Sequence, residues 1–125
     1  MSAGTPRLLL GSRMRLKQAR DFARVRREGR RIVCGCLIAN WQVLPPGSPV
    51  RIGVITTRKL GNAPVRARAR RLLREVFRLH QHDLAQPVDL VLVAQRTIVG
   101  KGLAAVESDL LAALRRGGIL KAQAQ

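Results

Sequence analysis

The sequence predicts a two-layer α/β sandwich, an α+β arrangement in which a small mixed sheet carries flanking helices in the order α-β-β-β-α-β-α. Its 125 residues suit one domain, and 46% of them are hydrophobic, which is enough for a core without disulfides. Apolar residues alternate between runs typical of strands and spacings of three and four typical of helices. This alternation favours helices packed on a sheet.

The first half predicts one helix and two or three strands. From Leu16, apolar residues recur at helical spacing as far as Gly29. Residues 31–44 are rich in apolar and β-branched residues and end at Pro45-Pro46-Gly47, which predicts a strand and a turn. Residues 50–57 alternate like a second strand, and we expect a hairpin between the two.

The second half predicts helix, strand and helix. Asn62 is placed to cap a helix over residues 62–79, and Pro64 suits its first turn. Residues 88–94 are almost wholly apolar, as in a strand covered on both faces. Residues 103–116 predict an amphipathic helix that ends at Gly117-Gly118.

We expect a single domain over residues 15–118, between a flexible basic tail (1–14) and a C-terminal tail (119–125). The basic residues of the first segment also resemble a transit peptide, although a basic arm explains them more simply. No apolar stretch is long enough to span a membrane, and Cys34 and Cys36 stand too close for a comfortable disulfide. These features favour a cytoplasmic protein with reduced thiols.

Charge is the outstanding feature of the composition. The chain has 24 Lys and Arg against 7 Asp and Glu, a net charge of +17. Residues 1–78 carry 19 of the basic residues and only 3 acids, so the excess belongs to one part of the molecule. Such a chain repels itself unless a polyanion neutralises it, which predicts a nucleic-acid partner. The alternative is a basic surface that only aids solubility.

The predicted helix at 62–79 separates core and charge. Val65, Ala69, Leu72, Leu73, Val76 and Phe77 fall on one side, whereas Arg66, Arg70 and Arg74 form a ridge at spacings of four beside them. Arg68, Arg71 and Arg78 extend the charge around the exposed side. Arginines so crowded repel one another, and their planar groups grip two phosphate oxygens at once. This pattern favours a phosphate-binding helix.

The segment RKLGNAPVRARARRLLREVFR (58–78) resembles the signature of the bacterial ribonuclease P protein family. The family shows a Lys-x-Gly-Asn-Ala turn, an Arg-Asn-Arg triplet, a basic pair and Arg-Glu before an aromatic residue, and the likeness extends over about residues 13–118. Two positions depart from the pattern: Ala67 replaces the Asn of the triplet, and Arg26 stands where the first helix usually has a second aromatic residue.

The resemblance implies an RNA-binding protein subunit that helps a catalytic RNA remove the 5′ leader from precursor tRNA. It also implies a left-handed strand–helix–strand crossover. The expected partners are ribonuclease P RNA and precursor tRNA, with no membrane and no obligate protein partner. The residues expected to bind the RNA subunit are Arg58, Lys59, Asn62, Arg66, Arg68, Arg70, Arg71 and Arg74. A cleft lined by Phe22, Arg26, Ile38, Asn40, Arg66 and Arg70 is expected to take the leader.

We expect no catalytic residue, metal or cofactor in the protein itself, with the hydrolytic Mg²⁺ bound by the RNA. His80, His82 and the two cysteines have the wrong spacing for a common zinc site. The main alternative is a ribosomal-type structural RNA-binding protein. A DNA-binding module is disfavoured because the arginine helix has few side chains that read base edges. A membrane-surface helix is excluded because its apolar stripe is needed to cover the strands.

Overall fold

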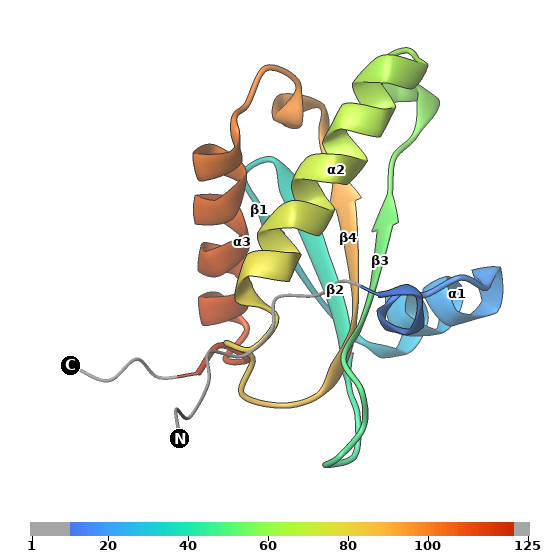
Figure 1. The fold of residues 1–125 in the computed structure, drawn as a ribbon, viewed down its shortest axis with the longest axis vertical. Coiled ribbons are helices and arrows are strands. Elements are labelled where there is room, and N and C mark those ends of the chain that lie inside the picture. Colours follow the sequence, from blue (N-terminus) through green and yellow to red (C-terminus); the bar gives the residue numbers. More distant parts are fainter. Residues whose placement is uncertain (1–10, 122–125) are drawn as a thin grey trace.

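The computed structural model describes residues 11–121, which form a four-stranded sheet with helices packed on it (Figure 1). None of the described helices is both long enough and apolar enough to cross a membrane. Short 3-10 helices occur at Ser12–Met14 (η1), Arg58–Leu60 (η2) and Arg96–Ile98 (η3). The main elements are α1 (Ala19–Glu28), β1 (Arg30–Cys34), β2 (Leu37–Val43), β3 (Arg51–Ile55), α2 (Ala63–His80), β4 (Val88–Ala94) and α3 (Leu103–Arg116).

The sheet has the strand order β1-β2-β4-β3. β2 is antiparallel to both β1 and β4, whereas β3 runs parallel to β4. The parallel pair is joined through α2, which lies in front of the sheet in Figure 1, and β4 lies to the left of β3. This crossover is therefore left-handed, as the family resemblance implies, and the element order α-β-β-β-α-β-α is confirmed.

The expected hairpin between residues 31–44 and 50–57 is wrong. Residues 31–44 themselves form the hairpin β1–β2, in which Cys34 pairs with Leu37 across the two-residue turn Gly35-Cys36. Gly35 has φ +58°, and a Cβ there would lie 2.2 Å from the carboxylate of Asp109, so only glycine fits. The strand at 50–57 instead adds to the far side of β4.

The two faces of the sheet are covered by different helices. Leu90 and Leu92 of β4 point towards α2 and α3 and belong to the main core, which also contains the buried Trp41. Val91 points to the other face, where it packs with Val25 of α1. The alternating side chains of β4 are thus buried on both sides, which explains its continuous apolar sequence.

Some residues of both expected tails pack as part of the domain. Ile119 is only 3% exposed and belongs to the main core, and Leu120 pairs with Leu84. At the other end, Met14 packs against the core at the end of η1. Leu16 is buried as expected, but it precedes the helix, which begins at Ala19. The rest of the two expected tails lies outside the described residues.

His80, the last residue of α2, connects this helix to α3. Its Nδ1 lies 2.8 Å from Asp83 Oδ2, and its Nε2 lies 2.7 Å from Glu107 Oε2 on α3. Burial favours the neutral imidazole, but the hydrogen bonds to Glu107 and Asp83 outweigh it and raise the pKa of His80 above its ordinary value. Protonated His80 therefore stabilises the packing of the two helices.

We expect the free energy of unfolding to fall as the pH rises above about 6.5, the pKa of an unfolded histidine. Because the folded-state pKa is raised, the His80 contribution is complete below that pH and is lost as the pH passes the folded-state pKa. We expect the free energy of unfolding to fall by only about 1 kcal/mol, because water screens the partly exposed carboxylates. Urea unfolding between pH 5.5 and 8.5 should show this dependence in His82→Gln but not in His80→Gln. An unchanged dependence in His80→Gln contradicts the assignment.

Candidate nucleic-acid interface

The N-terminal end of α2 is fixed by local residues. Asn62 Oδ1 accepts a hydrogen bond from the backbone N–H of Val65 at 3.2 Å, which confirms the predicted cap. Gly61 has φ +151° and passes so close to Val65 that a Cβ would lie 3.0 Å from that side chain. Arg58 and Lys59 are exposed in η2 just before this turn. Their cations and the positive end of the α2 dipole make this end attractive to anions.

α2 divides into an apolar side and a basic side, as the sequence predicts. Ala69, Leu73, Val76 and Phe77 are buried against the sheet and α3. The arginines lie outside this stripe and are exposed or half-buried. We call this basic side of α2 the arginine face; it consists of Arg66, Arg68, Arg70, Arg71, Arg74 and Arg78.

Three members of the arginine face donate to neutral protein oxygens, whereas Arg78 pairs with the carboxylate of Glu75. Arg66 Nη1 donates to the carbonyl of Gly61 at 2.7 Å, and Arg68 Nη2 to the carbonyl of Lys101 at 2.9 Å. Arg70 Nη1 donates to Thr56 Oγ1 at 2.9 Å. Each of these guanidinium groups has further N–H donors that point away from its partner, so it is oriented without being saturated.

Arg71 and Arg74 differ from these neighbours. Within residues 11–121, their side chains have no hydrogen-bond or ion-pair partner, and neither does the side chain of Arg15. Burial, and then repulsion by Arg15 and Arg70, lowers the pKa of the Arg74 guanidinium. Cations gathered in this way without an acceptor destabilise one another and favour a bound anion. We call Arg15, Arg71 and Arg74 the open cluster.

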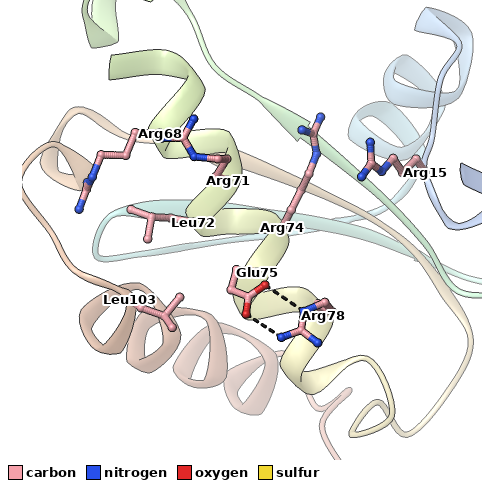
Figure 2. A pocket seen from close by; sticks show the side chains of 8 residues that line it. All are labelled: Arg15, Arg68, Arg71, Leu72, Arg74, Glu75, Arg78 and Leu103. Atoms are coloured by element: carbon pink, nitrogen blue, oxygen red, sulfur yellow. Dashed lines mark hydrogen bonds and ion pairs between the residues drawn. The ribbon is translucent and has the colours of Figure 1, made fainter. Parts of the chain in front are cut away.

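The predicted RNA-binding set did not include Arg15. It precedes α1 and reaches α2 because its backbone pairs with Ile52 in an isolated parallel bridge. No helical spacing connects it to the arginine face, so only the topology could reveal it. In Figure 2 its guanidinium lies beside that of Arg74, at one end of a pocket.

This pocket opens between α2 and the start of α3 and has a volume of about 670 Å³ (Figure 2). Glu75 is the single acid that lines it. Arg78 forms a bidentate ion pair with this residue: Nε donates to Oε1 at 2.9 Å and Nη2 donates to Oε2 at 2.7 Å. The hydrogen bonds from Arg78 lower the pKa of Glu75, so the carboxylate stays ionised and neutralised by its partner. The lining residues are Arg15, Arg68, Arg71, Leu72, Arg74, Glu75, Arg78 and Leu103.

A second depression, of about 580 Å³, lies between α1 and β3. We call it the α1 groove. Phe22 forms part of its floor and packs over Gly53, where a Cβ would lie 2.4 Å from the Phe22 ring. The groove is lined by Lys17, Ala19, Phe22, Ala23, Arg26, Val54, Ile55, Thr56 and Arg70.

The α1 groove brings together only part of the predicted leader cleft. Phe22, Arg26 and Arg70 line it, whereas Arg66 turns towards Gly61. Asn40 is 2% exposed, and its amide lies 3.4 Å from the carbonyl of Val91. Ile38 is half-buried on the same face of β2 and is not part of the groove lining. Lys17 and Thr56 also line the groove, although nothing in their local sequence spacing points to it.

The wall of this groove is anchored by a buried carboxylate. Asp89 of β4 is fully buried and accepts hydrogen bonds from Arg24 of α1 at 2.8 Å and from Arg51 of β3 at 2.9 and 2.8 Å. Hydrogen bonding to Asp89 outweighs burial and raises the pKa of both guanidinium groups. Asp89 therefore joins α1 to two strands of the sheet.

The residues considered for zinc are separated in the structure. Cys36 is buried, and burial raises the pKa of its thiol to about 12, so that it stays protonated. His80 is engaged by Asp83 and Glu107. Across residues 11–121, no three His, Cys, Asp or Glu side chains gather as a metal site. The absence of a metal or cofactor in the protein stays a prediction.

Similarity to other chains is extensive. The model of the family described as Ribonuclease P matches residues 10–118. The ribonuclease P protein component of Gluconacetobacter diazotrophicus is 36% identical over 110 residues, which cover 87% of this chain and 95% of that protein. That of Desulfovibrio desulfuricans is 37% identical, with 88% of this chain and 87% of that protein covered.

Solved structures repeat the fold. The ribonuclease P protein from Thermotoga maritima has a TM-score of 0.71 and 25% identity, with 82% of this chain and 96% of that one covered. The Staphylococcus aureus ribonuclease P protein has a TM-score of 0.77, with 86% of this chain and 98% of that one covered. At 21% identity, the second likeness bears on the fold alone.

Proposed function

Because this chain belongs to the ribonuclease P protein family, we propose that its arginine face binds the RNA subunit of that enzyme. The chain is the protein component of ribonuclease P, an RNA-binding subunit of a tRNA-processing endoribonuclease. The open cluster is the observation that carries the proposal. Arg15, Arg71 and Arg74 line one pocket without a described protein acceptor, and RNA phosphates supply the missing anions.

The remaining contacts to the RNA subunit extend from this cluster along the helix. Arg66, Arg68 and Arg70 are oriented by protein oxygens, so little side-chain entropy is lost when they meet a phosphate. The N-terminal end of α2 adds the positive end of its helix dipole beside Arg58 and Lys59. The full proposed set is Arg15, Arg58, Lys59, Asn62, Arg66, Arg68, Arg70, Arg71 and Arg74.

The α1 groove is the proposed site for the single-stranded 5′ leader of precursor tRNA. It offers the ring of Phe22 for stacking, with Lys17, Arg26 and Arg70 around it for phosphates. Arg26 replaces the second aromatic residue of the family pattern, so the groove depends more on charge than on stacking. Asn40 and Ile38 of β2 do not line the groove, and in this proposal they support it from the sheet.

The chemistry in this proposal belongs to the RNA subunit. The RNA holds the hydrolytic Mg²⁺ and cleaves the leader, and the protein positions the leader and neutralises phosphates. The protein supplies no catalytic residue and no cofactor. We further propose a cytoplasmic location, which the free thiols of Cys34 and Cys36 support.

Replacing Phe22 with alanine is expected to weaken binding of precursor tRNA to the reconstituted complex by about 5- to 150-fold, the range for one lost base stack. Binding of mature tRNA should change little, because it has no leader. The comparison is an affinity titration of both tRNAs against the RNA–protein complex. Phe22→Tyr, which keeps the ring, serves as the control and should bind like the parent. Equal losses for both tRNAs contradict the leader site.

A further inference from the structure

The pocket between α2 and α3 contains an apolar surface that phosphate binding does not require. Leu72 of α2 and Leu103 of α3 line its α3 side, and their side chains extend towards one another (Figure 2). Leu103 is 38% exposed, although it is a large apolar side chain. It is also the first residue of α3, directly after the Gly102 cap. Together the two leucines form an apolar surface bordered by arginines, which suits a ligand with an apolar face.

Cations surround this apolar surface on several sides. Arg74 and Arg15 lie at one end of the pocket in Figure 2, Arg68 lies at the other, and Arg71 lies beside Leu72. The ion pair between Glu75 and Arg78 closes the bottom in this view. The charge at the ends is therefore positive, while the α3 side is apolar.

The start of α3 adds to this positive potential. Gly102 caps the helix without a side-chain hydrogen bond, and no acid stands in its first turn. The N–H groups of that turn are therefore open to an anion beside Leu103.

The ligand of this pocket must match both its positive charge and its apolar surface. A stacked RNA duplex presents phosphates but no apolar surface, and a free inorganic anion has no apolar part either. An unpaired nucleotide has both, because its base exposes a flat apolar face and its two flanking phosphates carry the charge. Guanidinium groups also stack on bases, which suits Arg71 beside Leu72. The volume of about 670 Å³ is within the range of small-molecule sites.

We propose that this pocket receives one unpaired nucleotide of an RNA. The base packs on Leu72 and Leu103, and the open cluster binds its phosphates. The inference rests on the proposed function, since it assigns a recognition element of the RNA to this end of the arginine face. It adds selection for unpaired nucleotides to a surface otherwise selective only for charge.

The test uses three hairpin RNAs that share one stem. The first has a single unpaired adenosine in the stem, the second has an abasic residue at that position, and the third is fully paired. Their affinities for the full chain are measured by fluorescence anisotropy at one salt concentration. The variants are Leu103→Ser, which removes the apolar side chain without changing the charge, and Leu103→Met as the matched control. Thermal unfolding of both variants checks that the fold is retained.

The parent chain and Leu103→Met should bind the adenosine hairpin about fivefold more tightly than the abasic one, at the low end of the range for stacking on an aromatic ring. Leu103→Ser should bind these two equally, while its affinity for the paired hairpin stays unchanged. If the parent does not distinguish adenosine from the abasic residue, or if Leu103→Ser still does, the assignment of an unpaired nucleotide to this pocket is wrong. Binding of ribonuclease P RNA by the parent is measured alongside. If the parent binds this RNA but does not select the adenosine hairpin, only the pocket proposal fails; if it does not bind this RNA, the proposed function fails.

Discussion

Replacing both Arg71 and Arg74 with alanine is expected to lower the affinity for ribonuclease P RNA by about 10- to 100-fold at moderate salt. Each change removes a guanidinium that has no described protein partner and is therefore available for a phosphate. The slope of log affinity against log salt should fall by about two units, one for each lost contact. Titrations at several salt concentrations give both quantities.

The matched control for this variant replaces Arg115 and Arg116 with alanine. Both variants lose two positive charges, but Arg115 and Arg116 lie in the last turn of α3, about 20 Å along the helix from the pocket. If the arginine face is the binding surface, the control should keep most of its affinity. Equal losses in the two variants would mean that the RNA responds only to net charge, and the site assignment would be wrong.

Replacing Asp89 with asparagine is expected to lower the free energy of unfolding by about 3 kcal/mol, at the low end of the range for a broken buried ion pair. The carboxylate is fully buried, whereas Arg24 and Arg51 reach water and regain some hydration when it is lost. Urea unfolding measures the change. Because Arg24 belongs to α1, the variant should also loosen the wall of the α1 groove.

Asp21→Asn is the control for this second variant. Asp21 also pairs with Arg24, at 3.4 Å, but its side chain is 24% exposed and it joins residues of the same helix. We expect a loss below about 1 kcal/mol. A similar loss in both variants would contradict the view that Asp89 is the anchor of α1.

The features that sequence reasoning predicted correctly depend on neighbours in the chain. The Asn62 cap, the apolar stripe and the arginine face of α2 all follow from spacing within one helix. The buried strand β4 follows in the same way, because its run of apolar residues is covered on both faces.

The errors concern contacts between distant segments. The hairpin was misplaced because Gly35 is a single turn residue inside a continuous apolar run, and its importance comes from Asp109, far along the chain. Arg15 reaches the arginine face only through the parallel bridge with Ile52. The floor of the α1 groove depends on Gly53, whose missing side chain makes room for Phe22. None of these pairings leaves a local periodic signal.

The most direct test of the account is reconstitution of the chain with a bacterial ribonuclease P RNA. The measurement is the rate at which precursor tRNA is cleaved at low Mg²⁺, with and without the protein. We expect efficient removal of the leader only when the protein is present. The Arg71→Ala, Arg74→Ala variant should need a higher protein concentration for the same rate. Two results would contradict this assignment: cleavage that is equally fast without the chain, or an equal loss of rate in the variant at Arg71 and Arg74 and in the control at Arg115 and Arg116.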